Sequence, residues 1–334
     1  MYRSFYGFRV KPFQLKPDPD FYFGSKGHKR AMAYLEYGLS QGEGFIVITG
    51  EVGAGKSTLV RNLFRKLDTK EIVAAHIANT DLDSGDTLRM VAAAFGLPFE
   101  SLSKASLLIS IEQFLRGCDQ KGKRALLVVD EAQNLSPRTV EELRMLSNFQ
   151  TEERPLLQTF LLGQPEFRKT LLGADMQQLR QRVTATYHLG PMDSSETRAY
   201  IEHRLRTADW QGDPEFHDSA FAAIYDNSGG IPRKINALCD RLLLMGYLEK
   251  LHAFSDEEVN EVICDIQQEF EVAIAPAAGS QESVTLEPET SLRNLESMNS
   301  RVARLEESVI SLLELLKEVL SLPGLNKDSP KDRG

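Results

Sequence analysis

The stretch that decides the fold is FIVITGEVGAGKST, which runs from Phe45 to Thr58. Its first five residues are apolar or β-branched, as a buried parallel strand requires. The pattern Gly-x-x-x-x-Gly-Lys-Ser follows from Gly50 to Ser57, and helical spacing begins directly after it. A strand, a glycine-rich loop and a helix in this order predict a phosphate-binding loop, or P-loop.

Each part of this loop has a role in holding a nucleotide. Gly50, Gly53 and Gly55 allow a tight turn that brings backbone N–H groups against phosphate oxygens, and the helix start adds its positive dipole end. Lys56 is expected to reach the β- and γ-phosphates, and the Ser57 hydroxyl is expected to bind Mg²⁺. The other residues expected to line the nucleotide are Glu51, Val52, Ala54 and Thr58. We therefore predict ATP and Mg²⁺ as ligands.

A second motif follows another apolar strand. Residues 125–129 (ALLVV) run directly into Asp130 and Glu131, which is typical of a Walker B motif. Asp130 is expected to hold Mg²⁺ through water, and Glu131 is expected to polarise the water that attacks the γ-phosphate. Further strands are predicted at 72–77, 156–162 and 184–189, and helical stretches separate them. This alternation predicts a doubly wound parallel sheet of five strands, with ligands at the carboxyl ends of the strands.

Composition narrows the class of protein. The chain has 334 residues, 42% of them apolar and 26% charged, which fits a globular protein of more than one domain. Its net charge of -9 does not favour DNA as a partner. Its three cysteines show no metal-ligand spacing, and no apolar run is long enough to span a bilayer. We expect a cytoplasmic protein without membrane insertion, docked on the inner membrane at most through a partner.

Changes of pattern predict six segments. They are an N-terminal strap and helix (1–44), the P-loop core (45–190), a purely helical lid (191–270), a linker (271–290), a coiled coil (291–320) and a disordered tail (321–334). The strap is rich in aromatic residues and prolines, which predicts an irregular segment laid across the core. Its aromatic side chains either only pack or, around Gly24 to His28, touch an adenine ring.

The predicted coiled coil rests on a regular repeat. Its apolar residues alternate in steps of three and four over four heptads; they are Leu295, Met298, Val302, Leu305, Val309, Leu312, Leu316 and Val319. The alternative is an amphipathic helix folded back on the core.

The combined pattern resembles the AAA+ ATPases, and the resemblance implies further site residues. Asn79, after the second strand, matches the polar residue that restrains the catalytic glutamate. Gln164 matches sensor 1 and Arg233 matches sensor 2. Arg182 matches the arginine finger, with Arg180 as the reserve, and a finger acts on the site of a neighbouring subunit. The resemblance therefore implies a homo-oligomer.

Several stretches are also similar to the general secretion pathway protein A (ExeA-type) family. They include the entry segment from Tyr2 to Leu39, VVDEAQNLS, LLGQPEF and GGIPRKIN. The polysaccharide-export and exosortase-associated ATPases are similar in the same stretches and match the chain better in length. The resemblance implies an ATPase that serves assembly or regulation of a bacterial envelope export machine, with partner proteins bound through the coiled coil. Two alternatives stay open, a DNA-binding transposition-type ATPase and a nucleotide switch with little turnover.

Overall fold

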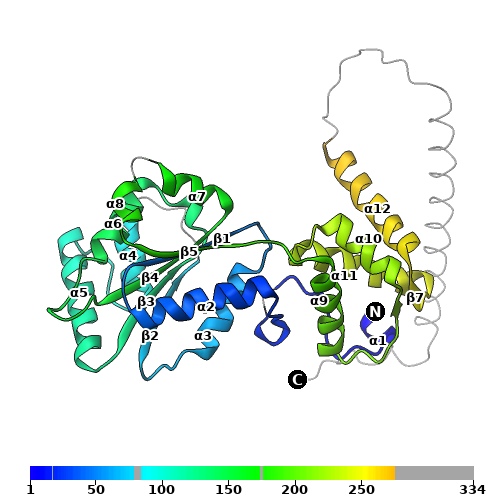
Figure 1. The fold of residues 1–334 in the computed structure, drawn as a ribbon, viewed down its shortest axis with the longest axis horizontal. Coiled ribbons are helices and arrows are strands. Elements are labelled where there is room, and N and C mark those ends of the chain that lie inside the picture. Colours follow the sequence, from blue (N-terminus) through cyan, green and yellow to red (C-terminus); the bar gives the residue numbers. More distant parts are fainter. Residues whose placement is uncertain (17, 79–83, 174–175, 275–334) are drawn as a thin grey trace, which may run out of the picture. The chain divides into compact units, whose positions relative to one another are not determined.

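Five parallel strands form the centre of the fold in the computed structural model, which describes residues 1–16, 18–78, 84–173 and 176–274 (Figure 1). The strands are β1 (Phe45–Gly50), β2 (Ile72–Ile77), β3 (Arg124–Val129), β4 (Leu157–Gly163) and β5 (Val183–Leu189). Their order across the sheet is β2-β3-β4-β1-β5, and every pair of neighbours is parallel. The predicted doubly wound parallel sheet is confirmed.

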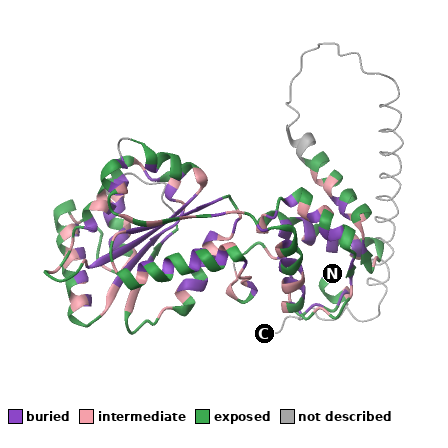
Figure 2. Cartoon of the chain, in the orientation of Figure 1, coloured by how far each residue is buried: buried purple, intermediate pink, exposed green. Residues whose placement is uncertain are grey.

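Helices cover both faces of this sheet because the central strands are apolar on both sides (Figure 2). Phe45 and Val47 of β1 point into a hydrophobic cluster formed with one group of helices. Ile46 and Ile48 point to the opposite face, into a hydrophobic cluster formed with a second group. The first group of helices comprises α4 (Ser84–Ala94), α5 (Lys104–Gln120), α6 (Pro137–Leu146), α7 (Pro165–Leu172) and α8 (Gln177–Arg180). The second comprises α2 (Lys26–Gln41) and α3 (Lys56–Lys66).

Four helices after the sheet form the lid. They are α9 (Ser194–Thr207), α10 (Asp218–Ser228), α11 (Pro232–Glu249) and α12 (Asp256–Ile274). A capping box formed by Asp193 and Glu196 begins α9. The lid is not purely helical, however, because β6 (Glu215–Phe216) and β7 (Ala253–Phe254) form a short parallel pair. Two-residue strands carry no periodic signal that a sequence could show.

The first thirteen residues of the N-terminal strap pack on the lid rather than across the core. After the short helices α1 (Tyr2–Phe5) and η1 (Pro19–Phe21), only α2 joins the sheet. The buried aromatic side chains of the first thirteen residues belong to the hydrophobic cluster of the lid; they are Tyr2, Tyr6, Phe8 and Phe13. Tyr6 lies at the end of α11, and its hydroxyl donates to the carbonyl of Leu251, just after that helix, at 2.9 Å. The expectation that the strap lies across the core was therefore wrong for its first thirteen residues, whereas Asp20 does lie against the core, where it pairs with Arg65 of α3 at 2.8 Å.

The predicted coiled coil (291–320), the tail and most of the linker lie outside the described residues. Among the helices that the structure describes, none is long and apolar enough to cross a membrane.

Candidate active site

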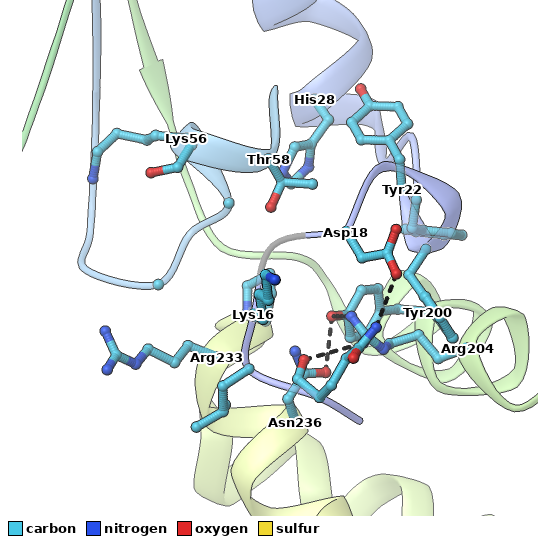
Figure 3. A pocket seen from close by; sticks show the side chains of 18 of the residues that line it. Lys16, Asp18, Tyr22, His28, Lys56, Thr58, Tyr200, Arg204, Arg233 and Asn236 are labelled. Atoms are coloured by element: carbon cyan, nitrogen blue, oxygen red, sulfur yellow. Dashed lines mark hydrogen bonds between the residues drawn. The ribbon is translucent and has the colours of Figure 1, made fainter. Parts of the chain in front are cut away.

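A cavity of about 300 Å³ opens at the carboxyl end of β1, where the predicted P-loop lies (Figure 3). The loop lines it from one side with Val52, Gly53, Gly55, Lys56 and Ser57. The strap, α2, the lid and the residues after β3 and β4 (Glu131 and Gln164) line the remaining sides. The cavity therefore lies at the edge of the sheet where parallel α/β folds bind ligands.

Two glycines give the loop its turn. Gly53 and Gly55 have φ angles of +83° and +99°, which residues with a Cβ atom rarely adopt. Space is equally restricted, because a Cβ on Gly55 would lie 2.6 Å from Nε2 of the buried His28. The His28 ring hydrogen-bonds the backbone of Ala54, and its Nδ1 lies 2.7 Å from the Ser25 hydroxyl. Burial lowers the pKa of His28, so the ring is held in its neutral form beneath the loop.

Lys56 is the first residue of α3 and is buried. Its Nζ donates to the carbonyls of Gly50 at 2.7 Å and Glu51 at 3.1 Å. Burial lowers the pKa of this ammonium group, and the nearby carboxylates of Glu131 and Asp130 oppose that effect. A desolvated cation at the base of a phosphate cradle can exchange its carbonyl contacts for phosphate oxygens.

Ser57 and Asp130 meet as the two motifs predict. The Ser57 hydroxyl donates to Oδ2 of Asp130 at 2.8 Å, and Asp130 is buried at the end of β3. A hydroxyl and a carboxylate oxygen are ligands that Mg²⁺ accepts, and Mg²⁺ usually keeps several waters beside one or two protein groups and substrate phosphates. These two residues therefore fit a nucleotide-bound Mg²⁺.

Glu131 lies at the centre of an amide network. Its backbone is left-handed, with φ at 53°, and its N–H donates to Oδ1 of Asp130 at 3.0 Å. Gln133 Nε2 donates to Glu131 Oε2 at 2.6 Å, and Gln164 Nε2 lies 3.4 Å from the same oxygen. Gln164 is the N-cap of α7 directly after β4, so this predicted sensor does lie beside the Walker B carboxylate.

The lid contacts the P-loop through α11. The backbone N–H of Arg233 donates to the carbonyl of Gly53 at 3.2 Å, and a Cβ on Gly53 would lie 2.3 Å from the Cβ of Arg233. Arg233 also lines the cavity, and Figure 3 shows it below the P-loop that carries Lys56. The structure thus brings the predicted sensor 2 residue to the nucleotide side of the lid.

The remaining predicted residues lie elsewhere. Arg182 precedes β5, and its carbonyl accepts from the N–H of Phe45 at the start of β1. It therefore lies at the amino-terminal edge of the sheet, a strand length of roughly 17 Å from the P-loop. Arg180 donates to the carbonyls of Leu171 and Gly173, which caps the end of α7. Asn79 lies outside the described residues.

Sequence reasoning missed part of the cavity wall. Tyr200 and Arg204 of the lid line the cavity and belong to no predicted motif. Gln14, Lys16 and Asn236 also line it; they lie in stretches that carry the family resemblance, but no role was predicted for them. They come together only because the strap packs on the lid. Gln133 could have been found, since it lies two residues after Glu131 of the Walker B motif.

Comparison of the sequence with known proteins points to the same kind of fold as this geometry. Residues 39–171 match the AAA domain family. General secretion pathway protein A of Aeromonas hydrophila is 40% identical over 253 residues, which cover 75% of this chain and 46% of that protein. The chain is an AAA+ protein related to general secretion pathway protein A. It spans about half the length of this relative.

Solved structures support the fold of this AAA+ chain. Cdc6p from Pyrobaculum aerophilum matches with a TM-score of 0.59 and 16% identity, over 76% of this chain and 70% of that one. The ORC2 protein of Aeropyrum pernix, solved with ADPNP and ADP, matches with a TM-score of 0.57 and 15% identity, over 76% and 71% of the two chains.

Proposed function

We propose that this AAA+ protein binds and hydrolyses ATP in the cavity beside the P-loop. The observation that supports this most is the meeting of Ser57, Asp130 and Glu131 at the carboxyl ends of β1 and β3, next to the buried Lys56. Nucleotide binding alone requires a P-loop and a cation. A carboxylate beyond the metal position is what hydrolysis requires in addition.

Each residue of the site has a separate role in the proposed hydrolysis. The N–H groups of the P-loop and Lys56 hold the phosphates, and Ser57 and Asp130 would hold Mg²⁺, which neutralises charge on the β- and γ-phosphates. Glu131 accepts a hydrogen bond from the attacking water and orients it toward the γ-phosphate. Gln164 lies where it can contact the water or the γ-phosphate while it faces Glu131.

Turnover is proposed to need a neighbouring subunit. Arg182 cannot reach the cavity of its own chain from the opposite edge of the sheet, whereas an arginine finger acts on the site of the next subunit. A homo-oligomer would therefore complete each site. Mixing Arg182→Ala with Glu131→Gln subunits should restore part of the activity, because some hybrid interfaces regain one intact site.

The cellular role is proposed from the relative. Identity of 40% over 75% of the chain favours an ATPase that serves a bacterial envelope secretion or polysaccharide-export system. The net charge of -9 argues against DNA as the partner, because DNA binding releases counterions through clustered Lys and Arg. DNA-stimulated, salt-sensitive turnover would contradict this assignment.

Two variants test the proposed chemistry. Lys56→Ala should abolish binding of a fluorescent ATP analogue, because it removes the cation of the phosphate cradle. Glu131→Gln should bind the analogue with wild-type affinity and show no measurable phosphate release at steady state. Wild-type protein that binds the analogue without turnover would instead indicate a nucleotide switch.

A further inference from the structure

Gln133 connects two strands of the active site through one side-chain amide. It lies in the short 3-10 helix η2 (Ala132–Asn134), which begins directly after Glu131. Its Nε2 donates to Glu131 Oε2 at 2.6 Å, and its Oε1 accepts the backbone N–H of Gln164 at 2.9 Å. The carboxylate at the end of β3 is thereby joined to the backbone at the end of β4.

The orientation of this amide follows from its partners. An ionised carboxylate only accepts hydrogen bonds, and a backbone N–H only donates one. The amide nitrogen must therefore face Glu131, and the amide oxygen must face Gln164. Both ends of the side chain are used, so neither a rotated amide nor a shorter side chain could make the same two bonds.

The backbone at Glu131 makes this restraint important. Glu131 has φ at 53° and ψ at 40°, and such a left-handed conformation costs a residue with a Cβ roughly 1–2 kcal/mol. The turn directs Gln133 back toward the carboxylate two residues earlier.

We propose that Gln133 is a positioning residue that fixes the Glu131 carboxylate for water attack and ties it to the end of β4. This inference rests on the proposed ATP hydrolysis. Gln133 acts through Glu131, because its two side-chain hydrogen bonds go to the Glu131 carboxylate and to the backbone N–H of Gln164.

Two substitutions separate the two hydrogen bonds. Gln133→Met keeps the length of the side chain and removes both bonds. Gln133→Glu keeps the acceptor for the Gln164 N–H but removes the donor to Glu131 and adds a like charge. Asn134→Ala is the matched control, because Asn134 is an exposed residue of the same turn.

We expect both Gln133 variants to lower kcat about ten- to hundredfold, the size of effect that misplacing a reacting group produces. Affinity for a fluorescent ATP analogue should stay within about twofold of the wild type, and Asn134→Ala should behave as the wild type. In the Glu131→Gln background, Gln133→Met should lower the residual single-turnover rate no further, because Gln133 acts through the carboxylate that is already missing.

The results distinguish failure of the Gln133 proposal from failure of the proposed hydrolysis. Full activity of Gln133→Glu would show that only the bond to Gln164 is needed and would overturn the proposal. A loss of ATP-analogue binding in Gln133→Met, or an equal further loss in the Glu131→Gln background, would show a structural role and would also overturn it. Wild-type protein that binds nucleotide but releases no phosphate would refute the proposed hydrolysis itself.

Discussion

Replacing Arg204 with methionine should loosen the N-terminal strap from the lid. Arg204 lies on α9 and is buried. Its Nε donates to the carbonyl of Pro12 at 2.6 Å, and its Nη2 donates to the carbonyl of Gln14 at 3.2 Å. Its guanidinium also stacks on the ring of Phe21, with 4.7 Å from Cζ to the ring centroid. One side chain thus holds the strap at three points.

The structure sets the size of the effect. Methionine retains most of the apolar stem but leaves two strap carbonyls without their donor. An unsatisfied buried acceptor costs about 1–3 kcal/mol, and the Gln14 carbonyl is only partly buried. We therefore expect the free energy of unfolding of the lid to fall by about 3 kcal/mol. With a urea slope of about 2 kcal/mol per M, the midpoint should fall by about 1.5 M.

Trp210 provides the assay. It is the only tryptophan of the chain and lies in the lid, where its Nε1 donates to the carbonyl of Pro214. Its fluorescence during urea unfolding reports on the lid directly. Arg206→Met is the matched control, since Arg206 is an exposed residue of the same helix whose pair with Glu202 contributes about 0.5 kcal/mol or less.

Equal midpoints for the Arg204 and Arg206 variants would refute this reasoning. Such a result would mean that the strap does not depend on the lid for its position. We also expect Arg204→Met to weaken binding of an ATP analogue, because strap residues such as Lys16 line the cavity.

Two further predictions concern buried residues of the core, and a third concerns the predicted coiled coil. Burial lowers the pKa of His28 below its usual 6.5, so the unfolded chain takes up the proton first as pH falls. The urea midpoint of the wild type should therefore be lower at pH 5.5 than at pH 7.5. This decrease should be smaller in the His28→Gln variant. Gly38→Ala would place a Cβ 2.4 Å from Cγ1 of Ile46, which should lower the free energy of unfolding by about 1–3 kcal/mol. Thermal unfolding measures this effect. An unchanged Tm would show that α2 can shift to make room for the methyl group. Leu305→Asp with Leu312→Asp should abolish self-association or partner binding without affecting nucleotide binding, and an unchanged mass in solution together with intact pull-downs would disprove the coiled coil.

The sequence predicted the sheet and the positions of the P-loop and Walker B residues because both are encoded locally. A buried parallel strand is a short apolar run, and the loop between Gly50 and Ser57 needs glycines at fixed positions. Asp130 and Glu131 follow their strand directly, and parallel strands end at the same edge of the sheet. Local pattern and three-dimensional position therefore coincide there.

The lid side of the cavity was not predictable in the same way. Arg204 reads as one of several arginines on an amphipathic helix, and only tertiary packing buries it against Pro12 and Gln14. The aromatic residues of the strap predicted packing but not the surface on which they pack. Long-range contacts between residues 2–16 and the lid have no periodicity that the sequence could show.

Phosphate release by the full-length wild-type protein, measured at steady state with Mg²⁺ and with EDTA, tests the central claim most directly. We predict Mg²⁺-dependent turnover that rises in specific activity with protein concentration and is absent from Glu131→Gln at equal nucleotide occupancy. Turnover by Glu131→Gln at the wild-type rate would contradict the assignment of Glu131. The absence of phosphate release from nucleotide-bound wild-type oligomers would contradict the proposal of an ATPase.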